Sequence, residues 1–404
     1  MRVDTMRRID HWAGVPLCFL LTLTLRLANL FRRPALRPAK RVLLIELSEM
    51  GSAILVDPAM RKLQREGGAE LFFLIFAGNK ASLDLLGTVP AANIFTIREG
   101  NLWVLSLDTL RFLLWTRRRG IDSVIDLELF SRFTALLTGL SGAANRVGFH
   151  AFFNEGLYRG DLLTRQVAYN PHQHIAKNFI ALVNALLAEK PELPYSKTLV
   201  DNEEIALQQV QVGSEELAAV EERIEELASL YRRGHTRVVL INPNASEMLI
   251  QRRWPAGRYA ELMRRILADF QDVVILITGA PGEREEAEQL KTAVGHERCI
   301  NFAGAVRFAQ LPALYTLSTL MVTNDSGPAH FAAITPLPTF VLFGPETPAL
   351  YGSLGNTTPI FAGLACSPCV SAANHRKTPC RDNICLQVIT PERVFDAIVP
   401  VLSS

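Results

Sequence analysis

The stretch TLMVTNDSGPAHFAAITPLPTFVLFGPETP, residues 319–348, has the pattern of a strand, a turn, a helix and a second strand. Leu320–Val322 and Thr339–Phe343 are short apolar runs of the kind that form buried parallel strands. Between them, Asn324–Gly327 combines turn and helix N-cap residues, and Pro328 suits a first helical position. The stretch therefore predicts a β-α-β unit of a parallel α/β sheet.

The start of this predicted helix is a candidate phosphate site. A helix that opens at the carboxyl end of a strand points its free N–H groups and its dipole outward, where they can hold an anion. Asp325, Ser326, Gly327 and His330 would lie at its edge. The residues alone leave an alternative open, in which Asp325 only caps the helix and His330 only packs.

Length and composition indicate a globular protein of two or three domains. The chain has 404 residues, 49% of them hydrophobic, and a formal net charge of +2. That length supplies ample core. Because the charge is nearly balanced, it gives no reason to expect nucleic acid as a partner.

The first 40 residues predict a membrane-associating helix and a linker. Between Met1 and Arg41 nine Lys or Arg residues and two Asp residues surround the apolar run Val15–Leu25. A membrane span needs about 20 apolar residues, and Arg26 with the Arg32–Arg33 pair argues against a signal peptide. We expect a helix lying on an anionic membrane surface. A soluble helix packed on the core and a single span remain as alternatives.

Two strand–turn sequences predict two Rossmann-like halves. Arg41–Leu47 opens the first half, for which we expect residues 41–195, and Thr236–Ile241 opens the second. The remaining predicted segments are a charged connecting helix at 196–234, the second domain at 235–390, and a C-terminal helix at 391–404 that returns to the first domain. The G-x-G-x-x-G motif of NAD-binding folds and the G-x-S-x-G motif of hydrolases are both absent from the sequence.

Two motifs resemble the signature of glycosyltransferase family 9, the heptosyltransferases of the lipopolysaccharide inner core. They are D-S-G-x-x-H-x-A-A from Asp325 and F-G-P-x-T-P at 343–348, and the resemblance extends from Arg41 to the end of the chain. It implies the GT-B fold, with two Rossmann-like domains facing a cleft. It further implies inverting, metal-independent transfer of heptose or a related sugar from an ADP-heptose-like donor. The implied acceptor is a lipopolysaccharide-core or other lipid-linked glycan at the cytoplasmic face of the inner membrane.

The resemblance also implies a set of donor-binding residues. Arg252 stands where the family has the lysine of K-x-W-P, which contacts the donor phosphates, and arginine can clamp phosphate oxygens with two donors. Glu283 matches an acid near the ribose or base. Alternatively, Arg252 is only a solvated cation. The predicted donor-binding set is Asn244, Ser246, Arg252, Glu283, Asp325, Ser326, Gly327, Gly344 and Thr347.

The catalytic base is where this chain departs from the family pattern. Relatives have a turn of the form S-x-x-G-D whose Asp is the proposed base, and here Ser52 takes that position. A serine of ordinary pKa cannot act alone as a general base. We therefore predict Glu49 as the base, with Ser52 and His330 completing the catalytic set, and Asp57 as a weaker candidate. Alternatively, Glu49 only caps a helix and the protein is a catalytically silent binder of nucleotide sugar or lipid.

Two further groups carry predictions of their own. In the first half, the resemblance to family 9 implies that Asp126, Glu128 and Arg132 face the acceptor; alternatively, they cap helices and are solvated. Near the C-terminus, four cysteines have the spacing C-x2-C-x10-C-x4-C, which suits either a structural zinc site or free or redox-active thiols, with His375 as another ligand. The four are Cys366, Cys369, Cys380 and Cys385. No metal is expected in catalysis, since the nucleotide loops lack a D-x-D pair.

Overall fold

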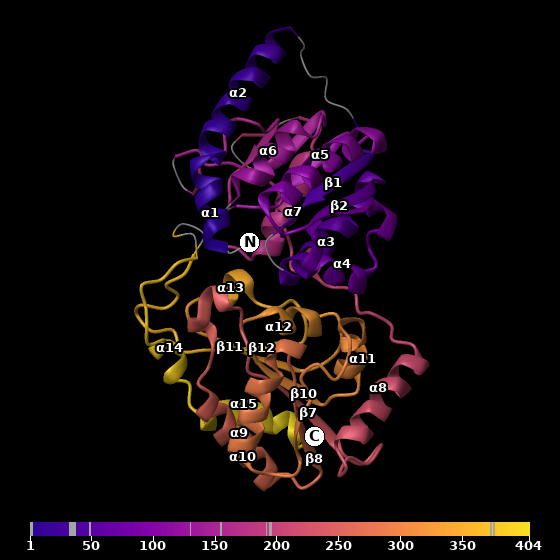
Figure 1. Cartoon of the computed structure of the whole chain (residues 1–404), viewed down its shortest axis with the longest axis vertical. Coiled ribbons are helices and arrows are strands. Elements are labelled where there is room, and N and C mark those ends of the chain that lie inside the picture. The colour runs from indigo at the N-terminus through magenta and orange to yellow at the C-terminus, as the bar shows by residue number, and fades with distance from the viewer. Residues whose placement is uncertain are drawn as a thin grey trace. The chain divides into compact units, whose positions relative to one another are not determined.

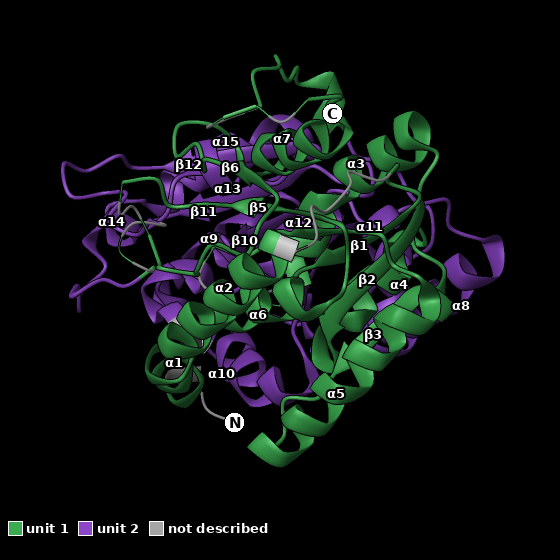
Figure 2. Ribbon diagram, turned by 90° about the horizontal axis from the view of Figure 1, so that it is seen from above, with its two compact units in different colours: residues 1–206, 372–376 green, residues 207–371, 377–404 purple. Residues whose placement is uncertain are grey.

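The structure is a computed structural model that describes residues 3–31, 38–47, 50–129, 131–153, 156–190, 192–193, 196–371, 374 and 376–404 (Figure 1). The chain forms two compact units, residues 1–206 with 372–376, and residues 207–371 with 377–404 (Figure 2). The charged helix expected between the domains is shorter than its predicted segment, and it belongs to the second unit as α8 (Ser214–Leu227).

The first unit contains a six-stranded parallel sheet with the strand order β3-β2-β1-β4-β5-β6. Its strands are β1 (Arg41–Ile45), β2 (Glu70–Phe76), β3 (Ile94–Ile97), β4 (Ser123–Asp126), β5 (Asn145–Phe149) and β6 (Arg165–Val167). Its helices are α1 (Val3–Trp12), α2 (Gly14–Phe31), α3 (Met50–Gly67), α4 (Lys80–Leu86), α5 (Leu102–Arg119), α6 (Arg132–Leu140) and α7 (Ile175–Leu187). This is the doubly wound Rossmann order, in which the connections reverse direction between β1 and β4.

The second unit repeats that order as β12-β11-β10-β7-β8-β9. Its strands are β7 (Arg237–Asn242), β8 (Val273–Ile277), β9 (Cys299–Asn301), β10 (Leu320–Asn324), β11 (Thr339–Phe343) and β12 (Thr357–Phe361). Besides α8, its helices are α9 (Ala256–Asp269), α10 (Arg284–Val294), α11 (Leu311–Thr316), α12 (Gly327–Ala332), α13 (Pro348–Tyr351), α14 (Ile384–Gln387) and α15 (Pro391–Leu402). The β10–α12–β11 unit is the one that residues 319–348 predicted, so the two-Rossmann prediction is confirmed.

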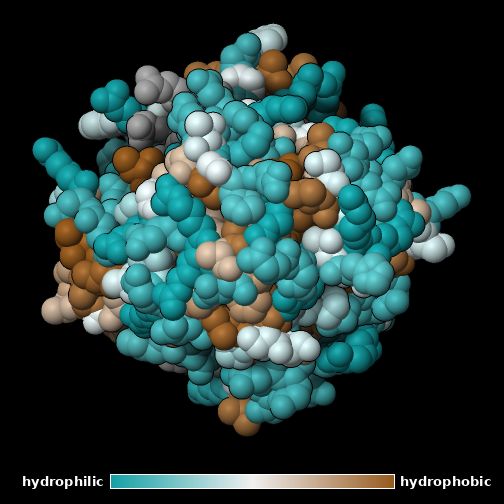
Figure 3. All heavy atoms as spheres, turned by 90° about the horizontal axis from the view of Figure 1, so that it is seen from below, coloured by the Kyte–Doolittle hydropathy of each residue, from teal (hydrophilic) through white to brown (hydrophobic). Residues whose placement is uncertain are grey.

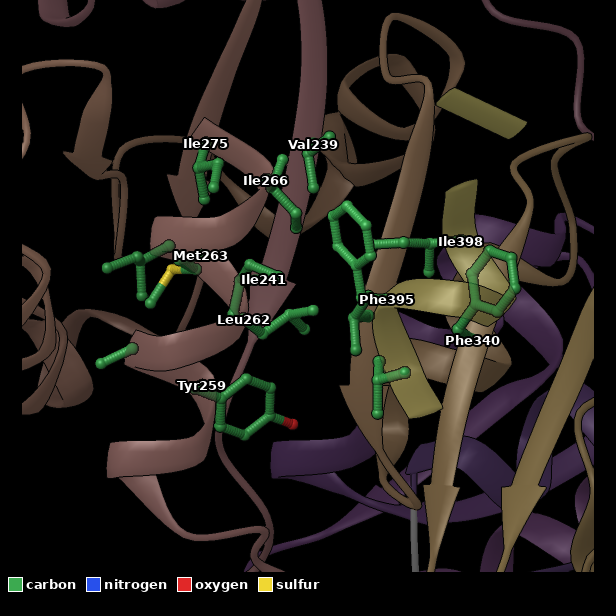
Figure 4. Packing of buried hydrophobic residues seen from close by; sticks show 14 of the residues in the cluster. Val239, Ile241, Tyr259, Leu262, Met263, Ile266, Ile275, Phe340, Phe395 and Ile398 are labelled. Carbon is green, nitrogen blue, oxygen red and sulfur yellow. The ribbon is translucent and has the colours of Figure 1, made fainter. Parts of the chain in front are cut away.

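The second unit has a continuous apolar core behind its strands. Hydrophilic residues cover most of the molecular face drawn in Figure 3, whereas Figure 4 shows β7 and β8 side chains meeting those of α9 and α15. Val239 of β7, Ile266 of α9 and Ile398 of α15 are each fully buried there. The prediction that the last helix returns to the first domain is wrong, because α15 completes the core of the second unit.

The N-terminal helices are docked on α6 within the first unit. Asp10 of α1 accepts hydrogen bonds from the backbone N–H groups of Arg132 (2.8 Å) and Phe133 (2.9 Å), so its carboxylate caps α6. Its other oxygen pairs with the Arg132 guanidinium at 3.1 Å. Arg132, which we expected to face an acceptor, is therefore buried in a contact with the N-terminal segment.

One face of α2 is packed and the opposite face is exposed. Cys18 is fully buried with Ala135 of α6, and a side chain at Gly139 would lie 2.9 Å from Leu21. The opposite face exposes Leu17, Phe19, Leu20, Leu23, Leu27 and Leu30. Residues Thr5–Leu30 are long and apolar enough to cross a membrane, by length and composition only. The helix is thus neither fully covered by the core nor free of it.

Candidate functional site

Most of the predicted donor-binding residues lie at the carboxyl ends of β7, β8 and β10. Strand β10 pairs with β7 on one side and with β11 on the other, so the connections of the second sheet reverse between β7 and β10. Ligands of open α/β sheets bind at such a switch point. The loop after β7 carries Asn244, and the loop after β10 carries Asp325 and Ser326.

Asn324, the last residue of β10, holds these loops together. Its side-chain N–H group donates to the carbonyl oxygen of Pro243 at 2.7 Å. Its side-chain oxygen accepts from the backbone N–H of Trp254 (3.0 Å) and from the Tyr259 hydroxyl (3.1 Å). Asn324 is fully buried, and sequence reasoning had assigned it only to a turn. The sequence signal that could have identified it is its place directly after the apolar run Leu320–Val322.

We expect Asn324→Leu to destabilise the second unit by about 3–5 kcal/mol, because it leaves buried donors of Trp254 and Tyr259 without an acceptor. Denaturant unfolding followed by intrinsic fluorescence measures this change. Asn356→Leu is the control, since that exposed side chain makes one hydrogen bond, to Pro336 at 3.2 Å. Equal stability losses in the two variants would contradict the role of Asn324.

Arg252 and Asp325 form the charged centre of the site. Both are buried, with exposed fractions of 6% and 4%, and the Arg252 Nη1 atom lies 4.0 Å from the Asp325 Oδ2 atom. The Nε atom of Arg252 is buried and has no hydrogen-bond partner among the residues that the structure describes. Arg252 is therefore not the solvated cation of the alternative interpretation. A buried guanidinium with an unused donor is suited to bind an anion.

The backbone around Arg252 is fixed by its neighbours. The Arg253 side chain donates twice to the Ala245 carbonyl oxygen, at 3.1 and 2.9 Å. The Asn383 amide donates to the carbonyl oxygens of Gln251 (3.3 Å) and Arg253 (2.9 Å). The segment Glu247–Arg252 is kinked at Leu249. These contacts give the Arg252 side chain a defined direction.

Asn244 and Glu283 both border Gly279, just after the end of β8. A side chain at Gly279 would lie 2.9 Å from the Glu283 Oε2 atom and 3.0 Å from the Asn244 Nδ2 atom, so both border this glycine. Glu283 Oε2 accepts from the Ala280 backbone N–H at 2.6 Å. The Nδ2 group of Asn244 is buried without a hydrogen-bond partner in the described part of the chain. It thus adds a second unused donor.

The helix of the opening stretch is short. Ser326 is its N-cap and α12 spans Gly327–Ala332. The Ser326 hydroxyl donates to the Asn324 carbonyl oxygen at 3.3 Å. His330 is half-buried, one turn into the helix. The structure brings Ser326, Gly327 and His330 onto the same loop and helix as Asp325.

Three other predicted donor-binding residues, Gly344, Thr347 and Ser246, each have different local surroundings. Gly344 is buried where a side chain would lie 2.7 Å from Leu386, so packing requires glycine there. The Thr347 hydroxyl accepts from the Ala349 N–H at 3.3 Å and caps α13. Ser246 is exposed.

The predicted catalytic turn is described only in part. Glu49 lies outside the described residues. Ser52 is half-buried in the first turn of α3. Asp57 is fully buried and accepts hydrogen bonds from Arg61 (2.7 Å) and Thr88 (2.5 Å). These contacts give Asp57 a structural role, which leaves it poorly suited as a base.

Arg159 was missed by sequence reasoning and organises the corresponding end of the first sheet. It pairs with Asp126 and donates to the carbonyl oxygens of Glu128 (2.5 Å) and Ser131 (2.9 Å). Burial raises the pKa of Asp126 above its usual value, and the positive charge of Arg159 opposes that rise. Both residues border a cavity of about 670 Å³ whose wall includes Phe19 and Leu23 of α2. An isolated arginine in a loop gives no sequence signal for such a role.

The four C-terminal cysteines lie in the second unit and form no disulfide among the residues that the structure describes. Cys369 Sγ lies 3.4 Å from the Thr378 hydroxyl, and Cys380 Sγ lies 3.3 Å from Asp382 Oδ1. Burial, with added repulsion from the other three cysteines, raises the pKa of Cys385. Over the described ranges no three His, Cys, Asp or Glu side chains are grouped as a metal-ligand set. His375 lies outside those ranges.

Two parallel Rossmann-like units, the second with a buried arginine at its switch point, define a protein of the GT-B glycosyltransferase class. Residues 115–378 match glycosyltransferase family 9 (heptosyltransferase), and the chain belongs to this family.

Among curated relatives, the chain is similar to lipopolysaccharide heptosyltransferase 2 of Salmonella typhimurium. The two are 33% identical over 100 residues, which are 24% of this chain and 28% of that protein. It is also similar to lipooligosaccharide heptosyltransferase 2 of Campylobacter jejuni, with 27% identity over 172 residues, 41% of this chain and 51% of the relative. The chain thus spans between about a quarter and half of the length of these relatives.

Solved structures share the fold over most of their length. ADP-heptose lipopolysaccharide heptosyltransferase II of E. coli superposes with a TM-score of 0.68 at 22% identity, covering 90% of this chain and 98% of that one. A family 9 glycosyltransferase from Veillonella parvula gives a TM-score of 0.67 at 18% identity, with 92% and 99% covered. E. coli heptosyltransferase WaaC, solved with ADP, gives 0.61 at 17% identity, with 89% and 99% covered.

Proposed function

We propose that this protein transfers heptose or a related sugar from an ADP-heptose-like nucleotide sugar to a lipopolysaccharide-core or other lipid-linked glycan. The observation that carries the proposal is Arg252, a buried arginine with an unused donor at the switch point of the second sheet. Relatives are named heptosyltransferases, and one was solved with ADP. Together these support a diphosphate as the anion that Arg252 binds.

In this proposal the second unit binds the donor and stabilises the leaving group. Arg252 and the backbone N–H groups of Ser326 and Gly327 take the diphosphate, because fixed donors in a buried site stabilise developing negative charge without a metal ion. Asp325 and His330 orient that loop and the sugar phosphate. Asn244 and Glu283 lie at the neighbouring strand end, where ribose hydroxyls are bound in such folds. Ser246, Gly344 and Thr347 complete the loops around the nucleotide.

The first unit binds the acceptor and supplies the base. Glu49 takes the proton from the acceptor hydroxyl as its oxygen attacks the anomeric carbon, and the bond to the diphosphate breaks. One displacement inverts the configuration at that carbon. Ser52 lies three residues further along, in the first turn of α3, where its hydroxyl would help to position the acceptor or Glu49.

The competing function is a catalytically silent protein that binds nucleotide sugar or lipid. It is favoured by Ser52 at the position where the family has an aspartate. An assay of released nucleotide with ADP-heptose, GDP-mannose or UDP-glucose and a lipid acceptor, with and without EDTA, separates the two. Turnover that survives EDTA supports metal-independent transfer. Donor binding without any turnover would favour the silent protein.

We further propose that α2 attaches the protein to the cytoplasmic face of the inner membrane. Its exposed leucines would enter the lipid while the opposite face stays packed on α6. Arg26 of α2 also pairs at 2.8 Å with Asp161, which lies between β5 and β6. If α2 crossed the membrane as a single span, its contacts with α6 and with Asp161 would have to break. The geometry thus favours a helix lying in the interface.

Replacing Leu20, Leu23 and Leu27 of α2 with serine should weaken binding to anionic vesicles by at least about tenfold, since each leucine contributes about 1.5–3 kcal/mol on burial. Flotation of the full chain with vesicles measures the effect. The matched control replaces the exposed Leu193, Leu199 and Leu230 with serine. Unchanged flotation of the α2 variant would refute the attachment, and retention in membranes after an alkaline carbonate wash would indicate a span.

A further inference from the structure

We propose that α5 is a second membrane-binding surface of this protein, selective for anionic lipid. The surface is the α5 stripe, which we define as Trp103, Leu107, Leu110 and Leu114, with Arg111, Arg117 and Arg118 beside it. The proposed attachment through α2 does not involve these residues. The two proposals are linked only by the position of both helices on one unit.

The α5 stripe is exposed apolar surface at helical spacing. Steps of four, three and four residues place its four members on one side of the helix. Their exposed fractions are 79% for Trp103, 37% for Leu107, 61% for Leu110 and 55% for Leu114. Scattered exposed leucines are ordinary on a protein surface, but a continuous stripe of this kind marks an interaction site.

The opposite side of α5 is firmly packed, so the stripe is not exposed by a loose helix. Phe112 is fully buried against the first sheet, and its ring stacks on Trp115 with ring centroids 6.2 Å apart. Asn101 caps the start of the helix by accepting from the Val104 N–H at 2.9 Å. Gly120, with φ of 63°, ends it. The stripe is therefore presented on a rigid element.

The charge around the stripe has one sign. The only acidic residue of α5 is Asp108, which is buried and held by Arg98 at 2.8 Å. Hydrogen bonds from Arg98 lower the pKa of Asp108 to about 2, so this buried acid stays ionised, and Arg111 pairs with it at 3.5 Å. Arg111, Arg117 and Arg118 are exposed. An apolar stripe with an exposed tryptophan and arginines beside it complements the acyl boundary and headgroups of an anionic bilayer.

The stripe lies on the same side of the first sheet as α2. Phe112 of α5 and Leu137 of α6 belong to one core cluster with Leu43 and Ile45 of β1, so both helices cover one face of the first sheet. The ends of α5 and α6 are joined where Arg117 donates to the Leu140 carbonyl oxygen at 3.0 Å. Helix α2 packs on α6, and Figure 2 shows α2, α6 and α5 on one side of the sheet.

A second copy of the chain is a poorer occupant than a membrane. In a twofold interface through the α5 stripe, α5 itself would offer no exposed acid to pair with the arginines of the other copy. In contrast, two helices that each bind lipid weakly hold a membrane far more firmly when both belong to one rigid unit. Lipid therefore fits both the apolar and the charged part of the surface.

The test compares full-length variants on vesicles of phosphatidylcholine alone and of phosphatidylcholine with 30% phosphatidylglycerol. Leu107, Leu110 and Leu114 to serine should lower the partition coefficient on anionic vesicles at least about tenfold. Arg118→Gln should lower it about fivefold, as about 1 kcal/mol for one basic residue gives. The controls are the serine variant of Leu193, Leu199 and Leu230 and, in the second unit, Arg232→Gln.

The outcomes for α5 and α2 are distinguishable. If both α5 variants bind vesicles as strongly as the wild-type protein, the α5 surface is refuted. The α2 attachment is then tested by the α2 variant alone. Loss of binding only in the α5 variants would support the stripe and count against α2. Light scattering provides the remaining outcome: a wild-type dimer that becomes monomeric in the stripe variant would show that a second copy covers α5. Unaltered binding of the nucleotide-sugar donor confirms that the variants are folded.

Discussion

Replacing Glu49 with glutamine is expected to lower kcat by about 10²- to 10⁴-fold while leaving donor affinity within about twofold of wild type. Glutamine keeps the size of the side chain but cannot accept the acceptor's proton, and a positioned general base contributes a factor of this order. The measurement is single-turnover transfer with saturating donor and acceptor, next to calorimetric binding of the donor. Separating the two readouts distinguishes a lost base from a lost site.

Two variants sharpen the Glu49 experiment. Glu66→Gln changes an exposed acid of α3 in the same way and should leave transfer unchanged. Adding Ser52→Asp to Glu49→Gln places a carboxylate at the family's position and should restore part of the lost rate. Near-normal kcat in Glu49→Gln would exclude Glu49 as the base, and no measurable transfer in the wild-type protein would return the silent protein to first place.

Replacing Arg252 with methionine is expected to lower kcat/KM by about 10²- to 10³-fold and to weaken donor binding as well. A buried donor aimed at developing charge is worth about this factor, and the 4.0 Å separation from Asp325 leaves the guanidinium free to reach a phosphate oxygen. Arg252→Lys keeps the charge but loses the second donor, so its activity should be intermediate. Steady-state transfer and donor calorimetry give both quantities.

Stability must be followed alongside the Arg252 experiment. Removing one partner of a buried ion pair can cost about 3–5 kcal/mol, because the other charge stays buried. Arg252→Lys avoids most of this cost and is therefore the decisive variant. Arg258→Met is the control, since Arg258 is only half-buried and, among the described residues, its side chain donates one hydrogen bond, to the Gln387 carbonyl oxygen at 3.3 Å. Wild-type donor affinity in folded Arg252→Lys and Arg252→Met would exclude the diphosphate role.

The two experiments address opposite ends of the reaction. Loss of donor binding in the Arg252 variants with unchanged binding in Glu49→Gln is the pattern expected of a transferase with separate donor and acceptor units. If neither the Arg252 variants nor Glu49→Gln lose donor binding, and transfer stays intact, the diphosphate must bind at another anion site in the second unit.

The two parallel α/β units could be predicted from the sequence because apolar strands and helix starts are encoded in neighbouring residues. Leu320–Val322 and Thr339–Phe343 are apolar without interruption, which only strands covered on both faces tolerate. Ser326 and Pro328 then place the start of α12 within a few residues. The same reasoning misplaced α15, since an amphipathic helix at the end of a chain does not say which core it covers.

The contacts that make the candidate site are not local. Arg252 and Asp325 are 73 positions apart in the sequence, and the Asn324 side chain joins segments separated by about as much. Nothing in the apolar pattern specifies which side chains will share one strand edge. The resemblance to family 9 selected several of these residues, but it gave no reason to notice Asn324 or Arg159, which act through backbone and buried contacts.

By itself the sequence determined the two Rossmann-like units, the family, and an apolar, basic N-terminal segment, because apolar periodicity, turn residues and short motifs are written in neighbouring positions. Only the tertiary structure decided that Arg252 is buried beside Asp325, that α2 keeps one face on α6, and that α5 leaves an apolar stripe exposed. Burial depends on which distant segments pack together. That is a property of the folded chain rather than of any stretch of it.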